Sequence, residues 1–347
     1  MPNEKITENI KKCSRCALCV QNCPIYEIKK DENNTARGLI CKLLGYEKKL
    51  LSEEDIKKDF KICLMCSKCK TNCPSKVDTT FAFGYKNAYF SPSKYSQRLF
   101  LGLKLLPLKF LYFTNFFKFK KSPNKNSTIF YFKGCVSKAQ HKNTFLDNLL
   151  HNPNFSCCGI PYLSGGDLKN YKKVKERNIE LIKKSTLVVF DCASCKSSIE
   201  DYSELNKEEK NKLIFFNDLL KEKKFKIKDN SKYKNKTIVF HKPCHLSNQD
   251  FKNIEAFLSS IKNINYQKLE NPDYCCGFGG SYFIFHPIIS SKIALKKAFT
   301  IKNINPDLIL TTCPSCTMGL RYGQIISKQF KKTLELRDFI EQHLEEI

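Results

Sequence analysis

The chain has 347 residues, of which 41% are hydrophobic, and its 60 Lys and Arg residues against 34 Asp and Glu give a formal net charge of +26. The hydrophobic content excludes a wholly disordered chain, and the length is sufficient for two or three domains. Lysine carries nearly all of the positive charge, because arginine occurs at only six positions. We therefore expect the lysines to lie on solvated faces, and we expect no nucleic-acid partner.

The 19 cysteines set the chain apart from an ordinary globular protein. The first residues, MPNEKITENIKK, do not form the basic and then apolar pattern of an export signal, so we expect a cytoplasmic protein. In a reducing compartment, this number of cysteines indicates metal ligation rather than a disulfide scaffold.

The first section, residues 1–90, contains two copies of the pattern C-x2-C-x2-C-x3-C-P, separated by a long insert that reads as mostly helical. In this spacing three thiolates bind one 4Fe-4S cluster and the fourth binds the other cluster. The expected sets are Cys13, Cys16, Cys19 and Cys73 for one cluster, and Cys63, Cys66, Cys69 and Cys23 for the other. Zinc is the alternative for a single C-x2-C, but four cysteines followed by proline, twice, argue against it.

Residues 91–127 form an apolar, basic segment and a linker. The longest apolar stretch, from Leu99 to Phe119, is interrupted by Lys104, Pro107 and Lys109, so we predict that it does not span a membrane. Two interpretations stay open. The stretch either packs across the cluster domains or lies on a membrane surface or partner subunit, which would make the protein peripheral on the cytoplasmic face.

The remainder of the chain repeats three landmarks in the same order, which predicts two tandem domains, residues 128–230 and 231–347. TIFYFKGC (128–135) recurs as TIVFHKPC (237–244), a Cys-Cys-Gly triplet recurs, and TLVVFDCASC (186–195) recurs as LILTTCPSC (308–316). Helical stretches at 168–184 and 287–303 separate the β-rich runs. This order predicts small α/β domains with parallel sheets, and the cysteines fall at the carboxyl ends of strands.

Each repeat contains five cysteines that suit a multi-iron cluster. Adjacent side chains diverge, so neighbouring cysteines fit separate irons better than one tetrahedral zinc, and the following glycine lets the backbone turn. The C-x2-C pairs, placed where a strand leads into a helix, put thiolates at a positive helix N-terminus. A thioredoxin-like dithiol at Cys313 and Cys316 is the alternative, but it leaves the other cysteines of the repeat without a role. The sets are Cys135, Cys157, Cys158, Cys192 and Cys195, and Cys244, Cys275, Cys276, Cys313 and Cys316.

Two C-x2-C-x2-C-x3-C-P motifs followed by two Cys-Cys-Gly modules resemble the glycolate oxidase iron–sulfur subunit and the heterodisulfide reductase-like Cys-Cys-Gly domain family. The resemblance implies a mostly helical two-cluster ferredoxin domain, and one or two further iron–sulfur clusters on the two five-cysteine sets. The first set departs from the family spacing, because 21 residues separate Cys135 from Cys157, against 30 between Cys244 and Cys275. We therefore expect the second set to be the more surely occupied.

Three residues outside these sets bear on the sites. Cys41 belongs to no set, and we expect a small buried side chain there. His241 and His245 flank Cys244 in the run HKPCH. Each either donates a hydrogen bond to a cluster thiolate or is an ordinary hydrogen-bonded histidine, and both interpretations stay open.

The sequence shows no G-x-G-x-x-G after a strand and no G-x-x-x-x-G-K-[ST], so no site for a flavin, a nicotinamide or ATP is evident. Iron–sulfur clusters pass single electrons, whereas oxidation of a hydroxy acid removes a hydride, so a flavin on another chain is needed. The resemblance implies an electron-transfer subunit. It would carry electrons from a flavin-containing dehydrogenase of glycolate, lactate or a similar 2-hydroxy acid to a quinone or other carrier. The alternative is a heterodisulfide reductase-like enzyme that reduces a disulfide at a Cys-Cys-Gly cluster. No catalytic residue is assigned.

Overall fold

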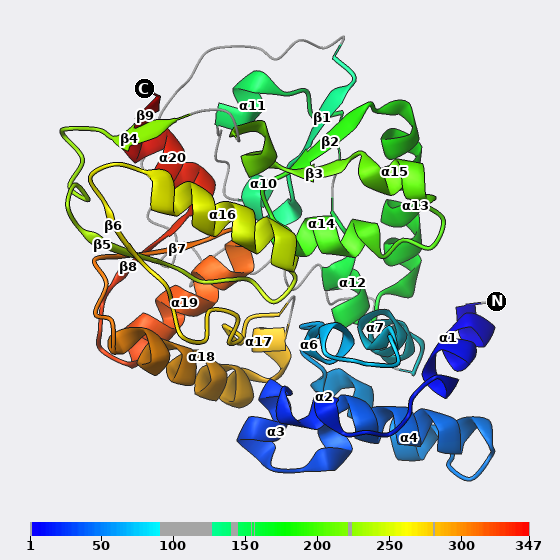
Figure 1. Ribbon diagram of the computed structural model, residues 1–347. Coiled ribbons are helices and arrows are strands. Elements are labelled where there is room, and N and C mark those ends of the chain that lie inside the picture. The colour runs from blue at the N-terminus through cyan, green and yellow to red at the C-terminus, as the bar shows by residue number, and fades with distance from the viewer. Residues whose placement is uncertain are drawn as a thin grey trace. The chain divides into compact units, whose positions relative to one another are not determined.

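The computed structural model describes residues 2–90, 127–139, 145–153, 155, 157–220, 224–279 and 282–346 (Figure 1). The apolar stretch from Leu99 to Phe119 lies outside the described residues. The chain forms two compact units. Unit 1 contains the described residues of Met1–Gly102, Gly159–Lys172 and Gly277–Ile293, and unit 2 those of Leu103–Cys158, Lys173–Cys276 and Ala294–Ile347.

The N-terminal part of unit 1 is built from short helices, which confirms the predicted mostly helical ferredoxin section. The elements are α1 (Pro2–Lys11), α2 (Leu18–Gln21), α3 (Pro24–Lys29), η1 (Glu32–Asn34), α4 (Ala36–Glu47), α5 (Glu53–Ile56), η2 (Asp59–Ile62), α6 (Lys68–Thr71) and α7 (Thr79–Phe90). Local sequence starts several of them. Thr35 caps α4, Ser52 and Asp55 form a capping box on α5, and Pro24 occupies the first turn of α3.

The core of unit 1 joins α4 to α7. Leu39 and Leu43 of α4 pack in one apolar cluster with Phe60, Phe83 and Phe90, and the ring centroids of Phe60 and Phe90 are 5.8 Å apart. Two segments that follow the Cys-Cys-Gly triplets complete this unit, namely α12 (Ile160–Ser164) and α17 (Tyr282–Phe285).

Both added segments approach the ferredoxin section closely. The side-chain amide of Asn87 on α7 donates to the carbonyl oxygens of Leu163, at 3.2 Å, and Ser164, at 3.0 Å. A Cβ atom on Gly279 would lie 2.5 Å from the carbonyl oxygen of Leu64, so only glycine fits there without a shift of the backbone.

In unit 2 the first repeat contains a three-stranded parallel sheet of β1 (Ile129–Phe132), β2 (Leu187–Phe190) and β3 (Leu213–Phe215), in the order β1-β2-β3. Phe132 pairs with Phe190, and their stacked rings are 5.1 Å apart. The helices of this repeat are α10 (Cys135–Ala139), α11 (Phe145–Leu149), α13 (Leu168–Lys184), α14 (Ala193–Glu200), α15 (Lys207–Asn211) and η4 (Phe216–Leu220).

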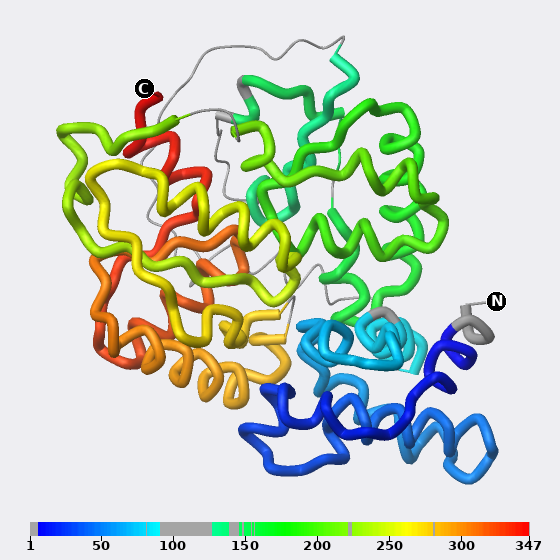
Figure 2. Tube along the Cα trace, in the orientation of Figure 1, coloured from blue at the N-terminus to red at the C-terminus, as the bar shows by residue number. Residues whose placement is uncertain are grey.

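The second repeat contains a four-stranded parallel sheet in the order β6-β5-β7-β8. Its strands are β5 (Thr237–Phe240), β6 (Asn265–Gln267), β7 (Leu308–Thr311) and β8 (Lys332–Glu335), and its helices are α16 (Asn248–Ser260), α18 (Pro287–Lys302), α19 (Pro314–Ile326) and α20 (Leu336–His343). An antiparallel pair, β4 (Phe225–Ile227) with β9 (Leu344–Glu346), lies outside both sheets. Figure 2 follows the chain from the green first repeat to the yellow and red second repeat. The prediction of two tandem α/β domains with small parallel sheets is confirmed.

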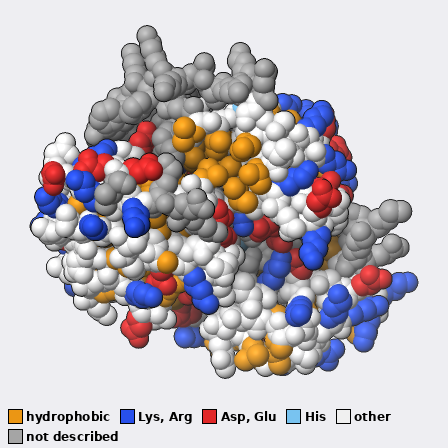
Figure 3. All heavy atoms as spheres, turned by 45° about the horizontal axis from the view of Figure 1, so that its top comes forward, with side chains coloured by type: hydrophobic (Ala, Val, Ile, Leu, Met, Phe, Trp, Pro, Cys, Tyr) orange, Lys and Arg blue, Asp and Glu red, His pale blue; other side chains and the backbone are white. Residues whose placement is uncertain are grey.

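The charged side chains are dispersed on the visible face. On the face drawn in Figure 3, Lys and Arg side chains stand among Asp and Glu side chains and do not form one continuous basic patch. Among the described residues, none of the helices combines the length and the apolar character needed to cross a bilayer.

Candidate metal centres

Two cavities in unit 1 are lined by the cysteines of the two C-x2-C-x2-C-x3-C-P motifs. One cavity is lined by Cys13, Cys16, Cys19 and Cys73, with Cys69 also in its wall. The other is lined by Cys63, Cys66, Cys69 and Cys23. The fourth cysteine of each motif therefore lines the cavity of the other motif, and the crossed ligation of two clusters stays a prediction. Each cavity thus has at least the four thiols that a 4Fe-4S cluster needs as donors.

The backbone of the two motifs follows the same path. Arg15 and Ala17 have positive φ angles of 59° and 66°, and Met65 and Ser67, at the same places in the second motif, have 53° and 61°. Such angles are uncommon for residues with a side chain. Their repetition indicates that both loops are held in a shape that turns three thiols toward one centre.

Polar groups already point at the thiols of the second motif. The hydroxyl of Thr79 lies 2.8 Å from Sγ of Cys69, and the N–H of Met65 donates to Sγ of Cys63 at 3.4 Å. Burial raises the pKa of Cys63, and it raises the pKa of Cys69 to about 12. A metal that binds these thiols must therefore displace protons from them.

Cys41 corrects one expectation. We expected a small buried residue, but Cys41 is exposed. It lies on α4, whose buried stripe consists of Ala36, Leu39, Ile40 and Leu43. That stripe follows the helical repeat of three to four residues, and position 41 is on another face of the helix.

The first five-cysteine set gathers at the carboxyl ends of neighbouring parallel strands. Cys135 begins α10 after β1, and Cys192 is the N-cap of α14 after β2. Sγ of Cys157 lies 3.7 Å from Sγ of Cys135. The shorter gap between these two cysteines, which placed the first set in doubt, therefore still brings their thiols into contact.

The Cys157-Cys158 pair is held by hydrogen bonds to its carbonyl groups. Asn178 donates to the carbonyl of Cys157 at 2.8 Å, and the carbonyl of Cys158 accepts from Ser198 at 2.8 Å and from Tyr202 at 2.9 Å. Gly159 then takes a φ of 94°, as predicted for a backbone that must turn directly after the pair.

The second five-cysteine set has the same plan. Cys244 follows β5, Cys313 is the N-cap of α19 after β7, and Cys316 lies in the first turn of that helix. Cys275, Cys276, Cys313 and Cys316 are buried and Cys244 is half-buried, and Gly277 has a φ of 82°. The thiol of Cys316 interacts with that of Cys276 as well as that of Cys313, so Cys313 and Cys316 do not stand as an isolated dithiol.

The two histidines of HKPCH have different environments. His241 is fully buried, and among the described residues neither ring nitrogen makes a hydrogen bond of normal geometry. Burial together with the charge of Lys297 lowers its pKa. A ring nitrogen of His241 and the Sγ atoms of Cys276 and Cys316 all lie within 4.8 Å of one another. His245 instead shares a hydrogen bond of 3.0 Å, through Nδ1, with the hydroxyl of Ser194, which lies 3.4 Å from Sγ of Cys313.

The two repeats meet at their cysteines within unit 2. The N–H of Ala193, which follows Cys192, donates to the carbonyl of Thr312, which precedes Cys313, at 2.9 Å. Hydrogen bonds from the thiols of Cys192 and Cys316 hold the pKa of Cys313 well below its usual value. The two five-cysteine sets are therefore in direct contact through Cys192 and Cys313 and the residues beside them; we call this contact the shared wall.

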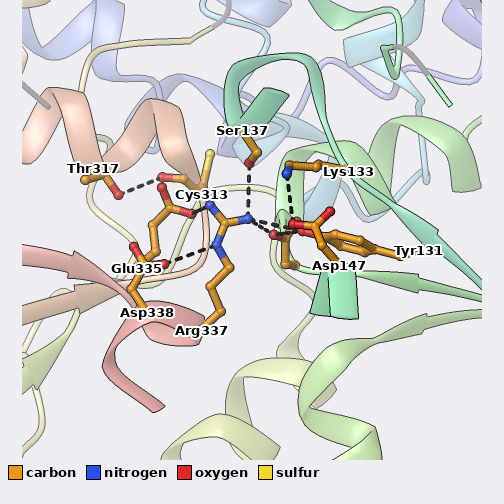
Figure 4. Close-up of polar contacts among 10 residues, drawn as sticks. Tyr131, Lys133, Ser137, Asp147, Cys313, Thr317, Glu335, Arg337 and Asp338 are labelled. Atoms are coloured by element: carbon orange, nitrogen blue, oxygen red, sulfur yellow. Dashed lines mark hydrogen bonds and ion pairs between the residues drawn. The ribbon is translucent and has the colours of Figure 1, made fainter. Parts of the chain in front are cut away.

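Beside this wall lies a buried ionic network that the sequence did not reveal (Figure 4). Arg337 of α20 pairs with Asp191, the residue before Cys192, and also with Glu335, at 2.8 Å. Its guanidinium donates to the hydroxyls of Tyr131, at 3.3 Å, and Ser137, at 3.2 Å. The only sequence signal was that Asp191 directly precedes a predicted ligand.

Comparison with known proteins agrees with this geometry. Residues 9–77 match the model of the 4Fe-4S dicluster domain, and residues 129–200 and 238–321 match the model of the cysteine-rich domain called CCG. The structure also resembles the crystal structure of a hypothetical protein from Helicobacter pylori. The TM-score is 0.50 and the identity 12%, over 88% of this chain and 66% of that one, which supports the fold alone.

The chain is similar to several curated proteins over about half of its length. It is 27% identical to a fumarate reductase (CoM/CoB) subunit of Methanothermobacter marburgensis, over 57% of this chain and 42% of that protein. It is 26% identical to lactate utilization protein A of Shouchella clausii, over 55% of this chain and 83% of the relative. It is also 26% identical to the probable glycolate oxidase iron-sulfur subunit of Bacillus subtilis, over 49% and 42%. The chain thus spans less than half the length of two of these three relatives.

The fold and the cysteine sites define an iron–sulfur protein with several cluster sites. The two domain matches make the assignment more specific. The chain contains a 4Fe-4S dicluster domain in front of two tandem cysteine-rich domains, and it is similar to the iron–sulfur subunits of oxidoreductases.

Proposed function

We propose that this chain is the electron-transfer subunit of a complex in which a separate flavoprotein oxidises glycolate, lactate or a similar 2-hydroxy acid. The observation that carries the proposal is the presence of four cysteine sites in one chain whose sequence has no evident nucleotide motif. Iron–sulfur clusters exchange single electrons. The names of the lactate utilization and glycolate oxidase relatives support the substrate class, and a quinone or another carrier is the proposed acceptor.

In unit 1 the residues proposed to hold clusters are the two crossed sets. Cys13, Cys16, Cys19 and Cys73 serve one cavity, and Cys63, Cys66, Cys69 and Cys23 serve the other. The hydroxyl of Thr79 and the N–H of Met65 stabilise the thiolate form of Cys69 and Cys63, which burial alone disfavours.

In unit 2 the two five-cysteine sets are proposed to hold further clusters. Cys192 and Cys313 each stand at the start of a helix, where the helix N-terminus favours a thiolate. Both Cys-Cys pairs are buried. Because the two sets lie against each other, we propose that electrons pass directly between them.

The test is to purify the full chain anaerobically from its native source, identify the proteins that accompany it, and measure iron and turnover. We expect a flavoprotein partner, and electron transfer from it that Cys276→Ala abolishes. We retain the expectation that Cys158→Ala has the smaller effect. Cys41→Ala is the matched control, because Cys41 is exposed and lies outside every set.

Two results would contradict the proposal. One is zinc in place of iron. The other is reduction of a disulfide by the chain without a flavoprotein, which would favour the heterodisulfide reductase-like alternative.

A further inference from the structure

His241 is a buried polar residue whose ring is poorly satisfied. It directly follows β5 and its side chain is 0% exposed. Among the described residues, neither Nδ1 nor Nε2 makes a hydrogen bond of normal geometry, and the carbonyl of Pro272 is the backbone acceptor that acts on the ring. Native proteins seldom leave a buried polar atom unpaired, and an unpaired group calls for an explanation such as an ion that belongs there. An imidazole is also one of the commonest nitrogen ligands of metals in proteins.

The polar neighbours of the ring include two thiols and one backbone carbonyl. The ring nitrogen lies within 4.8 Å of Sγ of Cys276 and Sγ of Cys316, and those two atoms lie within the same distance of each other. The nearby carbonyl of Pro272 already accepts from the N–H of Lys242, at 3.0 Å, and from Nζ of Lys297, at 3.2 Å. The ring therefore has at most a share of this acceptor, whose lone pairs also serve two other donors.

The first repeat shows that the fold does not need a histidine at this place. In the alignment of TIFYFKGC with TIVFHKPC, His241 corresponds to Phe132. Phe132 is also fully buried, and its ring packs on Phe155, at 4.9 Å, and on Phe190, at 5.1 Å. A phenyl ring fills the position in one copy, so packing alone does not explain an imidazole in the other copy.

We propose that His241 is a nitrogen ligand, alongside Cys276 and Cys316, of the metal group held by the second five-cysteine set. This inference rests on the proposed occupancy of that set. It distinguishes the two repeats chemically, because the second offers mixed nitrogen and sulfur ligation where the first offers sulfur alone. Where the imidazole of His241 occupies an iron position that an anionic thiolate fills in the first set, the neutral ligand raises the reduction potential of the iron–sulfur group. We therefore expect the group at the second set to be reduced at a higher potential than the group at the first.

The test uses the full chain, prepared anaerobically with its iron and with 15N-labelled histidine. The paramagnetic signal that belongs to the second set is identified as the one that Cys276→Ala removes. Pulsed electron–nuclear spectroscopy of that signal should show the strong coupling of a directly bound histidine nitrogen. His241→Phe should abolish the coupling. This substitution introduces phenylalanine, the residue that occupies the corresponding position, Phe132, in the first repeat.

His343→Phe is the matched control. His343 packs against Tyr233 and Phe339 at the end of α20, and its replacement should leave the coupling unchanged. A signal that depends on Cys276 but shows only the weak coupling of a hydrogen-bonded imidazole, or none, would overturn the ligand assignment. Absence of any iron that depends on Cys276 would instead refute the proposed occupancy of the second set, and the inference with it. If His241→Phe fails to fold, the wild-type spectrum compared with those of Cys276→Ala and His343→Phe still separates these outcomes.

Discussion

Arg337 and Asp191 form an ion pair between the two repeats in which neither side chain reaches solvent, with exposed fractions of 1% and 0%. Asp191 directly follows β2 of the first repeat, and Arg337 lies on α20 of the second. Asp191 also accepts from the hydroxyl of Tyr131 at 2.5 Å. The residue before Cys192 is thus held in place by a cation from the other repeat.

Replacing Arg337 by methionine should destabilise unit 2 strongly. The substitution leaves the carboxylate of Asp191 buried without its cation, and breaking a buried pair in this way costs about 3–5 kcal/mol. Hydrogen–deuterium exchange along β2 and β8 should accelerate accordingly. The double variant R337M/D191N should recover part of the loss. Unchanged exchange in the single variant would show that the pair contributes little.

Cys73→Ser should damage the cluster site of the first motif, because Cys73 lines the cavity of Cys13, Cys16 and Cys19. Anaerobic iron analysis and paramagnetic resonance should show loss at that site, while the site of Cys63 and Cys66 persists. The control is Cys41→Ser, an equally conservative change at an exposed cysteine, which should change neither signal. Loss confined to the cluster of the second motif would refute the crossed ligation.

Gly279→Ala should destabilise unit 1, because the new Cβ would lie 2.5 Å from the carbonyl oxygen of Leu64, a backbone atom that cannot rotate away. We expect a cost of about 1–3 kcal/mol, as for other overpacked sites. Gly45→Ala is the control within the same unit. There the Cβ meets only the flexible side chain of Leu51, at 3.0 Å, and alanine favours helix α4. Thermal unfolding should separate the two variants, and equal melting temperatures would contradict the close contact.

His343 should make the stability of unit 2 depend on pH. Burial, and then the charges of Lys232, Lys332 and Lys228, lower its pKa from 6.5 to about 4. The folded state therefore binds fewer protons than the unfolded state between these values, and stability falls as the pH drops from 6.5 toward 4. Because His343 is only half-buried, we expect a loss of about 1 kcal/mol at pH 5.

Two measurements check the effect of His343. Nuclear magnetic resonance of labelled histidine should give a pKa below 5 for this ring. The stability difference between pH 7 and pH 5 should also shrink in His343→Phe, which keeps the aromatic contacts with Tyr233 and Phe339. A ring that titrates near 6.5 would contradict the environment described above.

The grouping of the cysteines was predictable because it follows from their spacing along the chain. The C-x2-C-x2-C-x3-C-P motifs predicted which thiols share a cavity, and the strand-then-cysteine runs predicted Cys192 and Cys313 at helix starts. The burial of Cys41 was predicted wrongly, because the prediction followed the general tendency of cysteine to be buried. The apolar stripe of Leu39, Ile40 and Leu43 already indicated that another face of α4 is the buried one.

The ionic network and the contact between the repeats were not predictable in the same way. Arg337 lies 146 residues from Asp191 in the chain, and no periodicity or motif links the two positions. Likewise, the assignment of α12 and α17 to unit 1 depends on tertiary contacts such as that of Asn87 with Leu163. Such contacts depend on how the helices and strands pack against one another, and this packing cannot be read from the local pattern of a single sequence.

The hydrogen bond from Ala193 to Thr312 has a consequence for the duplicated architecture. A gene duplication starts as two self-sufficient copies, but here each copy now forms part of the interior of the other. A fragment that ends between the repeats would expose the N–H of Ala193 to water and would leave Asp191 without its counter-ion. It would also expose the side of Cys192 that faces the second repeat. We therefore expect that the smallest piece of the chain that keeps either set of five cysteines intact contains both repeats.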